Sequence, residues 1–233
     1  MSADELAAAL AEGAEGALGD VVRGAVSSAA REAEALMQMV PGPGFSTTLV
    51  GVVAGPDGGF FFHVGDGAAL AYETAPFGEA ESASELPVED AEPETAPTEA
   101  EAVTTETPLG EIEAGRDTQR EDGAHPVVSP PENGTFDDIT YPIDTNPDDQ
   151  HLRITTFSAA SFIVLMTDGP MPFTLERNQD ALAAGVFRPL IGHLAGPRGQ
   201  EIGGRLIAKL LADPRAGEIS NDDKTILVLR RIV

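Results

Sequence analysis

The sequence predicts an α+β domain in which strands pair mainly as hairpins, forming layers, and helices are grouped around them. A long helical segment opens the chain, several short apolar runs separated by turn residues follow, and two helical segments precede a last apolar run. A doubly wound α/β fold would need strands and helices to alternate along the chain, and here they do not. The order of the segments therefore favours α+β.

The first segment, Ala3 to Met39, is helical by its content and by apolar residues that recur near the 3.6-residue period. Glycines weaken its first half, so we expect two helices joined near Gly19-Asp20. The run Pro41-Gly42-Pro43-Gly44 ends the helical region.

The remaining elements follow from short apolar runs and turn residues. Pro56 to Gly59 forms a turn between two strands, which predicts a hairpin. The run from Ser161 to Thr167 is continuously apolar, as in a strand covered on both faces. We expect the last run, Ile226 to Ile232, to be a central strand. The expected strands are 47–54, 60–66, 68–72, 136–143, 151–156, 161–167 and 226–232, and the expected later helices are 175–194 and 198–211.

Composition limits the class of protein. A chain of 233 residues, 42% of them apolar, suits one domain over residues 1–233. Cysteine is absent, which excludes disulfides and thiolate metal sites. There is no basic-then-apolar leader and no run long enough for a membrane helix, so we expect a cytoplasmic protein. A formal charge of −25 argues against nucleic acid or an anionic membrane as a partner.

The acidic charge is concentrated in one segment. Residues 73–122 hold 16 Asp and Glu but only two basic residues, together with prolines and few large apolar side chains. Such a segment cannot bury enough surface to offset its ordering entropy, so residues 74–125 are predicted to be a disordered acidic insertion. It serves either as a solvated loop that keeps the protein soluble or as a segment that attracts basic partners.

Three apolar runs are bounded by acidic residues, and these residues are the candidate site. Asp168 follows one strand, Asp222 precedes another and Asp66 follows a third. Carboxylates that converge at strand ends repel one another unless a hard divalent cation lies between them. Mg²⁺ and Mn²⁺ accept such oxygen ligands, and two to four carboxylates suffice for a site.

Simpler interpretations accompany each candidate. Asp before Gly is common in turns, which accounts for Asp66 and Asp168 without a metal, and Asp222 also suits a polar loop before a strand. His63 lies among apolar strand residues and is interpreted as a position in the sheet, not as a catalytic base. No His pair shows metal-ligand spacing, and no Ser has the glycine elbow of a serine hydrolase.

Taken together, the segments resemble the metal-dependent protein serine/threonine phosphatases of the PPM (PP2C) type. Residues 46–50 are similar to that family's "GTTL" strand, and residues 63–68 to its "HVGDSRA" segment. Residues 166–169 match its "SDG" motif, and residues 222–225, with the apolar run after them, match "DNxT" and the last strand. Residues 131–135 are similar to the "PENGEY" pattern of a bacterial subgroup. The motifs occur in the family's order.

The resemblance implies an α-β-β-α sandwich of four layers with a binuclear Mn²⁺ or Mg²⁺ centre at one end of two packed sheets. It gives Asp168 and Asp222 the role of ligands to one metal and relates Asp66 to a third, weaker metal. The implied reaction is hydrolysis of phosphoserine or phosphothreonine by metal-activated water, without a covalent intermediate. The implied partner is a phosphoprotein substrate or a kinase.

The chain also departs from the family pattern. The first metal motif, a strand ending "DGxxG" whose Asp bridges the two metals, has no counterpart, so the expected domain is N-terminally incomplete and no catalytic side chain is assigned. Asp223 replaces the usual Asn, and Gly67 the usual Ser. Either upstream strands complete the site, or the chain is a catalytically silent interaction module. In both cases we expect little or no phosphatase activity from this chain as written.

Overall fold

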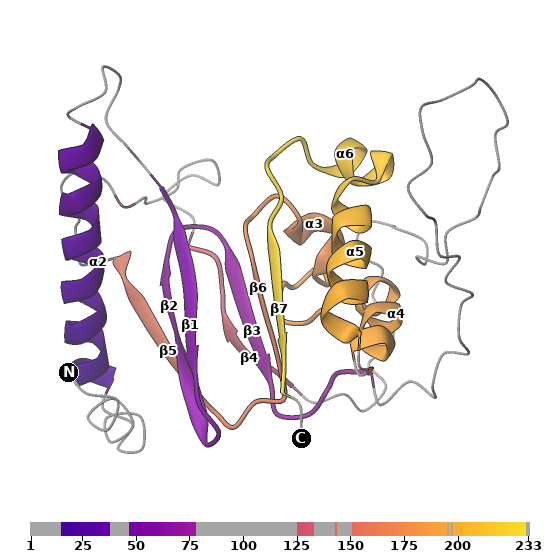
Figure 1. Cartoon of the computed structure of the whole chain (residues 1–233), viewed down its shortest axis with the longest axis horizontal. Coiled ribbons are helices and arrows are strands. Elements are labelled where there is room, and N and C mark those ends of the chain that lie inside the picture. Colours follow the sequence, from indigo (N-terminus) through magenta and orange to yellow (C-terminus); the bar gives the residue numbers. More distant parts are fainter. Residues whose placement is uncertain are drawn as a thin grey trace, which may run out of the picture.

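The computed structural model describes residues 15–37, 47–77, 125–132, 143, 151–194, 196 and 198–231. In these ranges the chain combines helices with two antiparallel sheets, which confirms the α+β class (Figure 1). The helices are α2 (Glu15–Met37), α3 (Met171–Thr174), α4 (Ala184–Leu194), α5 (Gly199–Leu211) and α6 (Pro214–Ile219). The strands are β1 (Leu49–Ala54), β2 (Gly58–Val64), β3 (Ala68–Tyr72), β4 (Val127–Ser129), β5 (Arg153–Ser158), β6 (Phe162–Met166) and β7 (Ile226–Arg230).

The strands form one sheet of three and one of four. The first has the order β1-β2-β5, and the second has the order β4-β3-β6-β7. The expected hairpin is present as β1 and β2, with Leu49 opposite Val64 and a hydrogen bond from Gly55 N to Gly58 O of 2.8 Å across the turn. Successive residues of a strand point to opposite faces, so each sheet offers one face to the other sheet.

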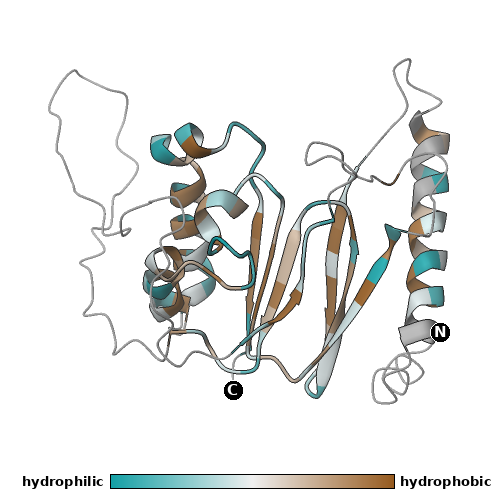
Figure 2. Cartoon of the chain, turned by 180° about the vertical axis from the view of Figure 1, so that it is seen from behind, coloured by the Kyte–Doolittle hydropathy of each residue, from teal (hydrophilic) through white to brown (hydrophobic). Residues whose placement is uncertain are grey.

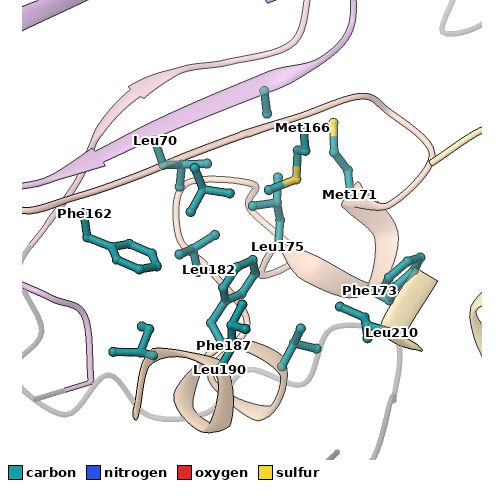
Figure 3. Close-up of a cluster of buried hydrophobic side chains, with 14 of the residues drawn as sticks. Leu70, Phe162, Met166, Met171, Phe173, Leu175, Leu182, Phe187, Leu190 and Leu210 are labelled. Carbon is teal, nitrogen blue, oxygen red and sulfur yellow. The ribbon is translucent and has the colours of Figure 1, made fainter. Parts of the chain in front are cut away.

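Two apolar clusters hold these layers together. Between the sheets, Phe61 and Phe157 pack with the inward residues of β3 and β6, and their ring centroids are 4.9 Å apart. The opposite face of the four-stranded sheet packs against α3 to α6, and Figure 2 shows hydrophobic residues concentrated on these strands and helices. Figure 3 shows this second cluster, in which Phe187 and Leu190 of α4 point toward Leu70 and Phe162 of the sheet.

Helix α2 lies on the other side of the molecule. Its Val26 packs against a small apolar cluster built on Val64 of β2 and Ile143, which Leu49 of β1 also joins. In Figure 1 the sequence of layers from left to right is α2, the three-stranded sheet, the four-stranded sheet and the later helices. The expected break near Gly19-Asp20 is wrong, because α2 continues through both residues.

Strand β6 fits its sequence pattern, whereas β7 does not. All five residues of β6 are at most 4% exposed, and the strand lies between β3 and β7. The predicted central position of β7 is wrong among the described residues, where β7 is the edge strand of its sheet. Leu227 and Leu229 face the inter-sheet side but are 48% and 39% exposed, because the facing sheet ends at β1 in the described part of the chain.

The other sequence expectations agree in outline and differ at the boundaries. Helix α5 begins and ends within one residue of its predicted range, whereas α4 begins nine residues later than predicted. The reason is a small hairpin before α4, in which Leu175 pairs with Leu182 and Gln179 has a φ of 58°. The short elements β4, α3 and α6 were not predicted.

Some expectations fall on residues that the structure does not describe. Of the predicted strand 136–143, only Ile143 is described, and it pairs with Thr47. The predicted acidic insertion, 74–125, lies outside the described residues except for 74–77 and 125. Within the described ranges, no helix has both the length and the apolar character needed to cross a bilayer.

The cross-strand pair of Leu165 and Leu227 gives a matched test of the core. Leu165 is 4% exposed and Leu227 is 48% exposed. We expect Leu165→Ala to lower the free energy of unfolding by about 2–5 kcal/mol, because it leaves a cavity between the sheets. The same change at Leu227 should cost about 1 kcal/mol or less, because much of its side chain is already in water. Urea denaturation of both variants measures the difference, and equal losses would contradict this view of the core.

Candidate metal site

The three predicted metal residues lie at one end of the four-stranded sheet. Asp66 also follows β2, the second strand of the β1–β2 hairpin. In the sheet register, Ala68 of β3 pairs with Met166 of β6, and Met166 pairs with Ile226 of β7. Asp66 stands just before β3, Asp168 just after β6 and Asp222 in the loop that leads to β7. Because neighbouring strands are antiparallel, the turns that carry all three residues lie at the same end of the sheet.

Thr167 and Gly169 fix the β6 end of this site against the loop before β7. Thr167 N donates to Thr225 O at 3.2 Å, and Thr225 N donates to Thr167 Oγ1 at 3.1 Å. A side chain at position 169 would collide with the carbonyl oxygen of Asp223. The glycine after Asp168 thus allows the close approach of two backbones, which places Asp168 beside the 222–223 loop.

The loop that carries Asp222 is held by local hydrogen bonds. The Asp222 carboxylate accepts a hydrogen bond from Asp223 N at 2.8 Å. The Lys224 ammonium donates to the carbonyl oxygens of Ser220 and Asp222, at 2.7 and 2.8 Å. Asp222 and Asp223 are exposed, whereas Asp168 is half-buried.

The pKa of Asp168 is raised above the ordinary aspartate value. Burial is the largest cause, followed by a side-chain hydrogen bond with Asp222 and by the negative charges of Asp66 and Asp222. A hydrogen bond from the backbone of Gly169 acts in the opposite direction. Asp168 therefore lies close to Asp222 and within electrostatic reach of Asp66, and this end of the sheet disfavours a third negative charge.

This set of donors suits a hard divalent cation only in part. All the donors are carboxylate oxygens, which Mg²⁺ and Mn²⁺ prefer, and a cation would relieve the repulsion that, after burial, contributes to the raised pKa of Asp168. However, no three His, Cys, Asp or Glu side chains in the described ranges are grouped so that they could hold a metal ion. The structure thus brings Asp168 and Asp222 together and places Asp66 nearby, and the metal role of all three stays a prediction.

A second group of polar residues lies beside this end of the sheet, and it was not predicted from the sequence. His63, at the end of β2, is fully buried, with its Nδ1 3.1 Å from both Ser129 Oγ and an Arg153 guanidinium nitrogen. Arg153 also lies 3.5 Å from the carboxylate of Glu132, which contacts His151 Nδ1 at 3.1 Å. The sequence signal for this group is Arg153, a charged residue at the start of an otherwise uncharged strand. Only the sheet register shows that Arg153 is the cross-strand partner of His63.

His63 is confirmed as a residue of the sheet. Burial, and then the positive charge of Arg153, lowers its pKa to about 3. Arginine can only donate hydrogen bonds, so Nδ1 of His63 is the acceptor and the proton of the neutral ring is on Nε2. A ring that gains a proton only near its pKa of about 3 is a weak base at physiological pH, which favours the position in the sheet over the role of a catalytic base.

Comparison with known proteins identifies one family. The family model described as protein phosphatase 2C matches residues 2–210. Asp66 and Asp168 lie inside the matched residues, whereas Asp222 and β7 lie beyond them. No curated protein and no solved structure shows a significant match to this chain.

The raised pKa of Asp168 predicts a dependence of stability on pH. The folded protein holds this proton more tightly than the unfolded chain, so stability is lost as the pH rises through the raised pKa. Without divalent cations, Asp168→Asn should therefore melt at a higher temperature than the wild type at pH 7. The gain should vanish below the ordinary aspartate pKa, about 4.

Thermal melts of both proteins between pH 3 and 8 test this expectation. Asp57→Asn, in the exposed turn between β1 and β2, is the matched control and should not show the same gain. A variant Asp168→Asn that is no more stable than the wild type at any pH would contradict the assigned repulsion.

Proposed function

Because the chain belongs to the protein phosphatase 2C family, we propose that it is a metal-dependent domain that hydrolyses phosphoserine and phosphothreonine in proteins. The observation that carries the proposal is that Asp168, just after β6, lies beside Asp222 in the loop before β7, where burial and then the neighbouring carboxylates raise the pKa of Asp168. A divalent cation binds closely spaced carboxylates. Without a cation, such carboxylates repel one another and destabilise the folded protein.

Asp168 and Asp222 are the residues that would hold the metal, with Asp66 as a more distant carboxylate. When bound, Mn²⁺ or Mg²⁺ supplies a water of lowered pKa and neutralises charge on the phosphoryl group. The residues of the chain orient these ligands: Thr167 and Gly169 bring the backbone of Asp168 against the 222–223 loop, and Lys224 braces that loop. The phosphoprotein is the substrate in this proposal.

The arrangement of layers supports a more specific fold. One helix, two sheets and a group of helices follow one another in Figure 1, as expected for a four-layer α-β-β-α sandwich of PP2C type. We propose this architecture for the whole domain. The absence of cysteine and the acidic charge agree with a cytoplasmic location, which is also part of the proposal.

We propose that the hydrolytic activity of this chain is low. A metal pair needs a carboxylate that bridges its two ions, and in the described ranges Asp66, Asp168 and Asp222 do not form a group of three ligands around one position. Two adjacent carboxylates are enough to hold one ion weakly, with water as the remaining ligands.

The same observation favours a second candidate function. A chain that belongs to the family but shows no group of three metal ligands among its described residues suits a catalytically silent PP2C-like module that binds a phosphoprotein or a kinase. Metal binding and turnover separate the two candidates, because the silent module needs neither of them.

Calorimetry with Mn²⁺ tests the metal role of Asp168. We expect measurable binding by the wild type and at least about a tenfold loss of affinity in Asp168→Asn, which corresponds to about 1.4 kcal/mol. Asp57→Asn, which removes one exposed carboxylate elsewhere, should bind as the wild type does. Equal binding by all three proteins would show that Mn²⁺ responds only to the overall negative charge.

Hydrolysis of a phosphothreonine peptide with Mn²⁺ tests the proposed reaction. We expect slow turnover that Asp168→Asn abolishes. Complete absence of turnover, together with retained binding of the phosphopeptide, would favour the silent module. Turnover as fast as that of an intact family member would refute the proposed low activity.

A further inference from the structure

We propose that Arg153 and Glu132 are positioning residues that clamp the turn carrying Asp66 and so set the distance of that carboxylate from Asp168. The inference rests on the proposed metal-dependent function. It adds two residues to the three candidate ligands of that function, Asp66, Asp168 and Asp222. The candidate ligands come from strand ends, and each strand end needs something that fixes its turn. For Asp168 and Asp222 this role falls to Thr167 and Gly169, and for Asp66 it falls to the polar cluster of His63, Ser129, Glu132 and Arg153.

The clamp acts on a single atom, the carbonyl oxygen of Gly65. This oxygen accepts a hydrogen bond from Glu132 N at 3.0 Å and another from an Arg153 guanidinium nitrogen at 3.1 Å. Gly65 has a φ of 106°, in the region that favours glycine, so the chain reverses sharply just before Asp66. Two donors on one carbonyl oxygen fix the direction of this peptide, and Asp66 is the next residue.

Arg153 ties this turn to two other segments of the chain, β2 and residues 130–132. Its guanidinium group donates to the carbonyl oxygen of Pro130 and to His63 Nδ1, and it faces the carboxylate of Glu132. Arg153 belongs to β5 and His63 to β2, and residues 130–132 follow β4 of the other sheet. The guanidinium fork therefore joins both sheets at the end where Asp66 lies, which a single ammonium group would not do.

Partial burial of Arg153 and Glu132 favours a positional role over a stabilising one. The Arg153 and Glu132 side chains are only 26% and 28% exposed, and an ion pair with this little solvent contributes little net stability compared with apolar packing. Its hydrogen bonds are directional, however, and they select one geometry of the turn. Glu132 is itself held by His151, which fixes the acceptor that Arg153 faces.

The position of this turn has a direct electrostatic effect on the site. The charge of Asp66 is among the causes that raise the pKa of Asp168, so the two groups interact across the turn. Gly67 packs against the end of β6, where an added Cβ would lie 2.7 Å from Met166 O. A turn released from Arg153 would move Asp66 relative to Asp168, and a cation held at Asp168 would then be attracted less strongly by the Asp66 carboxylate.

Arg153→Lys tests the clamp while keeping the charge. Lysine has one nitrogen and cannot reach Gly65 O, Pro130 O and His63 Nδ1 together with the geometry of the fork. We expect an affinity for Mn²⁺ lowered about three- to tenfold by calorimetry, and amide hydrogen exchange at residues 65–68 faster by at least about tenfold. Arg205→Lys, an exposed exchange on α5 beside Glu201, is the matched control and should change neither quantity.

Glu132→Gln is the second variant and is used if Arg153→Lys does not fold. It keeps the backbone donor to Gly65 O and removes only the charge facing Arg153, so the clamp predicts the same changes with smaller size. The inference is overturned if the wild type binds Mn²⁺ and every variant that folds binds it as tightly as the wild type does. If the wild type does not bind Mn²⁺, the proposed metal function fails, and exchange at residues 65–68 decides the clamp alone, with unchanged exchange overturning it.

Discussion

The burial of β6 between two antiparallel neighbours is the constraint on which the rest of the structure depends. Its five side chains alternate between the inter-sheet cluster and the helix-covered cluster, and all are at most 4% exposed. A shift of one residue would exchange the two faces and expose both clusters, so the register with β3 and β7 is strongly determined. The carboxylate of Asp168 is placed by the same register.

This constraint also imposes a conflict at the end of the strand. Packing favours Asp168 close to the loop before β7, where it is half-buried beside Asp222, while electrostatics favours separation of the two groups. A purely structural sequence would resolve the conflict with a neutral residue. The conflict is retained here by a glycine at 169 that admits the close approach, which is the pattern expected where stability is given up for binding.

The parts of the fold that the sequence predicted are those determined by local patterns. The continuous apolar run of β6, the hairpin of β1 and β2, and the strand β3 were all predicted near their observed bounds, because alternation and turn residues act over a few positions. The same pattern misled at β7, since leucines at 227 and 229 are typical of a covered strand and these two are exposed. Periodicity reports which face is apolar and does not report whether anything covers it. The cluster of His63, Glu132 and Arg153 was out of reach for another reason: its contacts join residues 63 and 153, which only the tertiary fold brings together.

The edge position of β7 bears on the two candidate ligands unequally. Asp168 follows a strand with a neighbour on each side, whereas Asp222 precedes a strand with one described neighbour and a partly uncovered apolar face. At its far end β7 is followed by Arg231, which donates to Pro56 O in the hairpin turn of the other sheet at 3.0 Å. At its other end, near the acidic residues, β7 is held to β6 by the hydrogen bonds between Thr167 and Thr225. The distance from Asp168 to Asp222 is therefore set mainly by one threonine and one glycine, and the rigidity of the site depends on these short contacts more than on the bulk of the core.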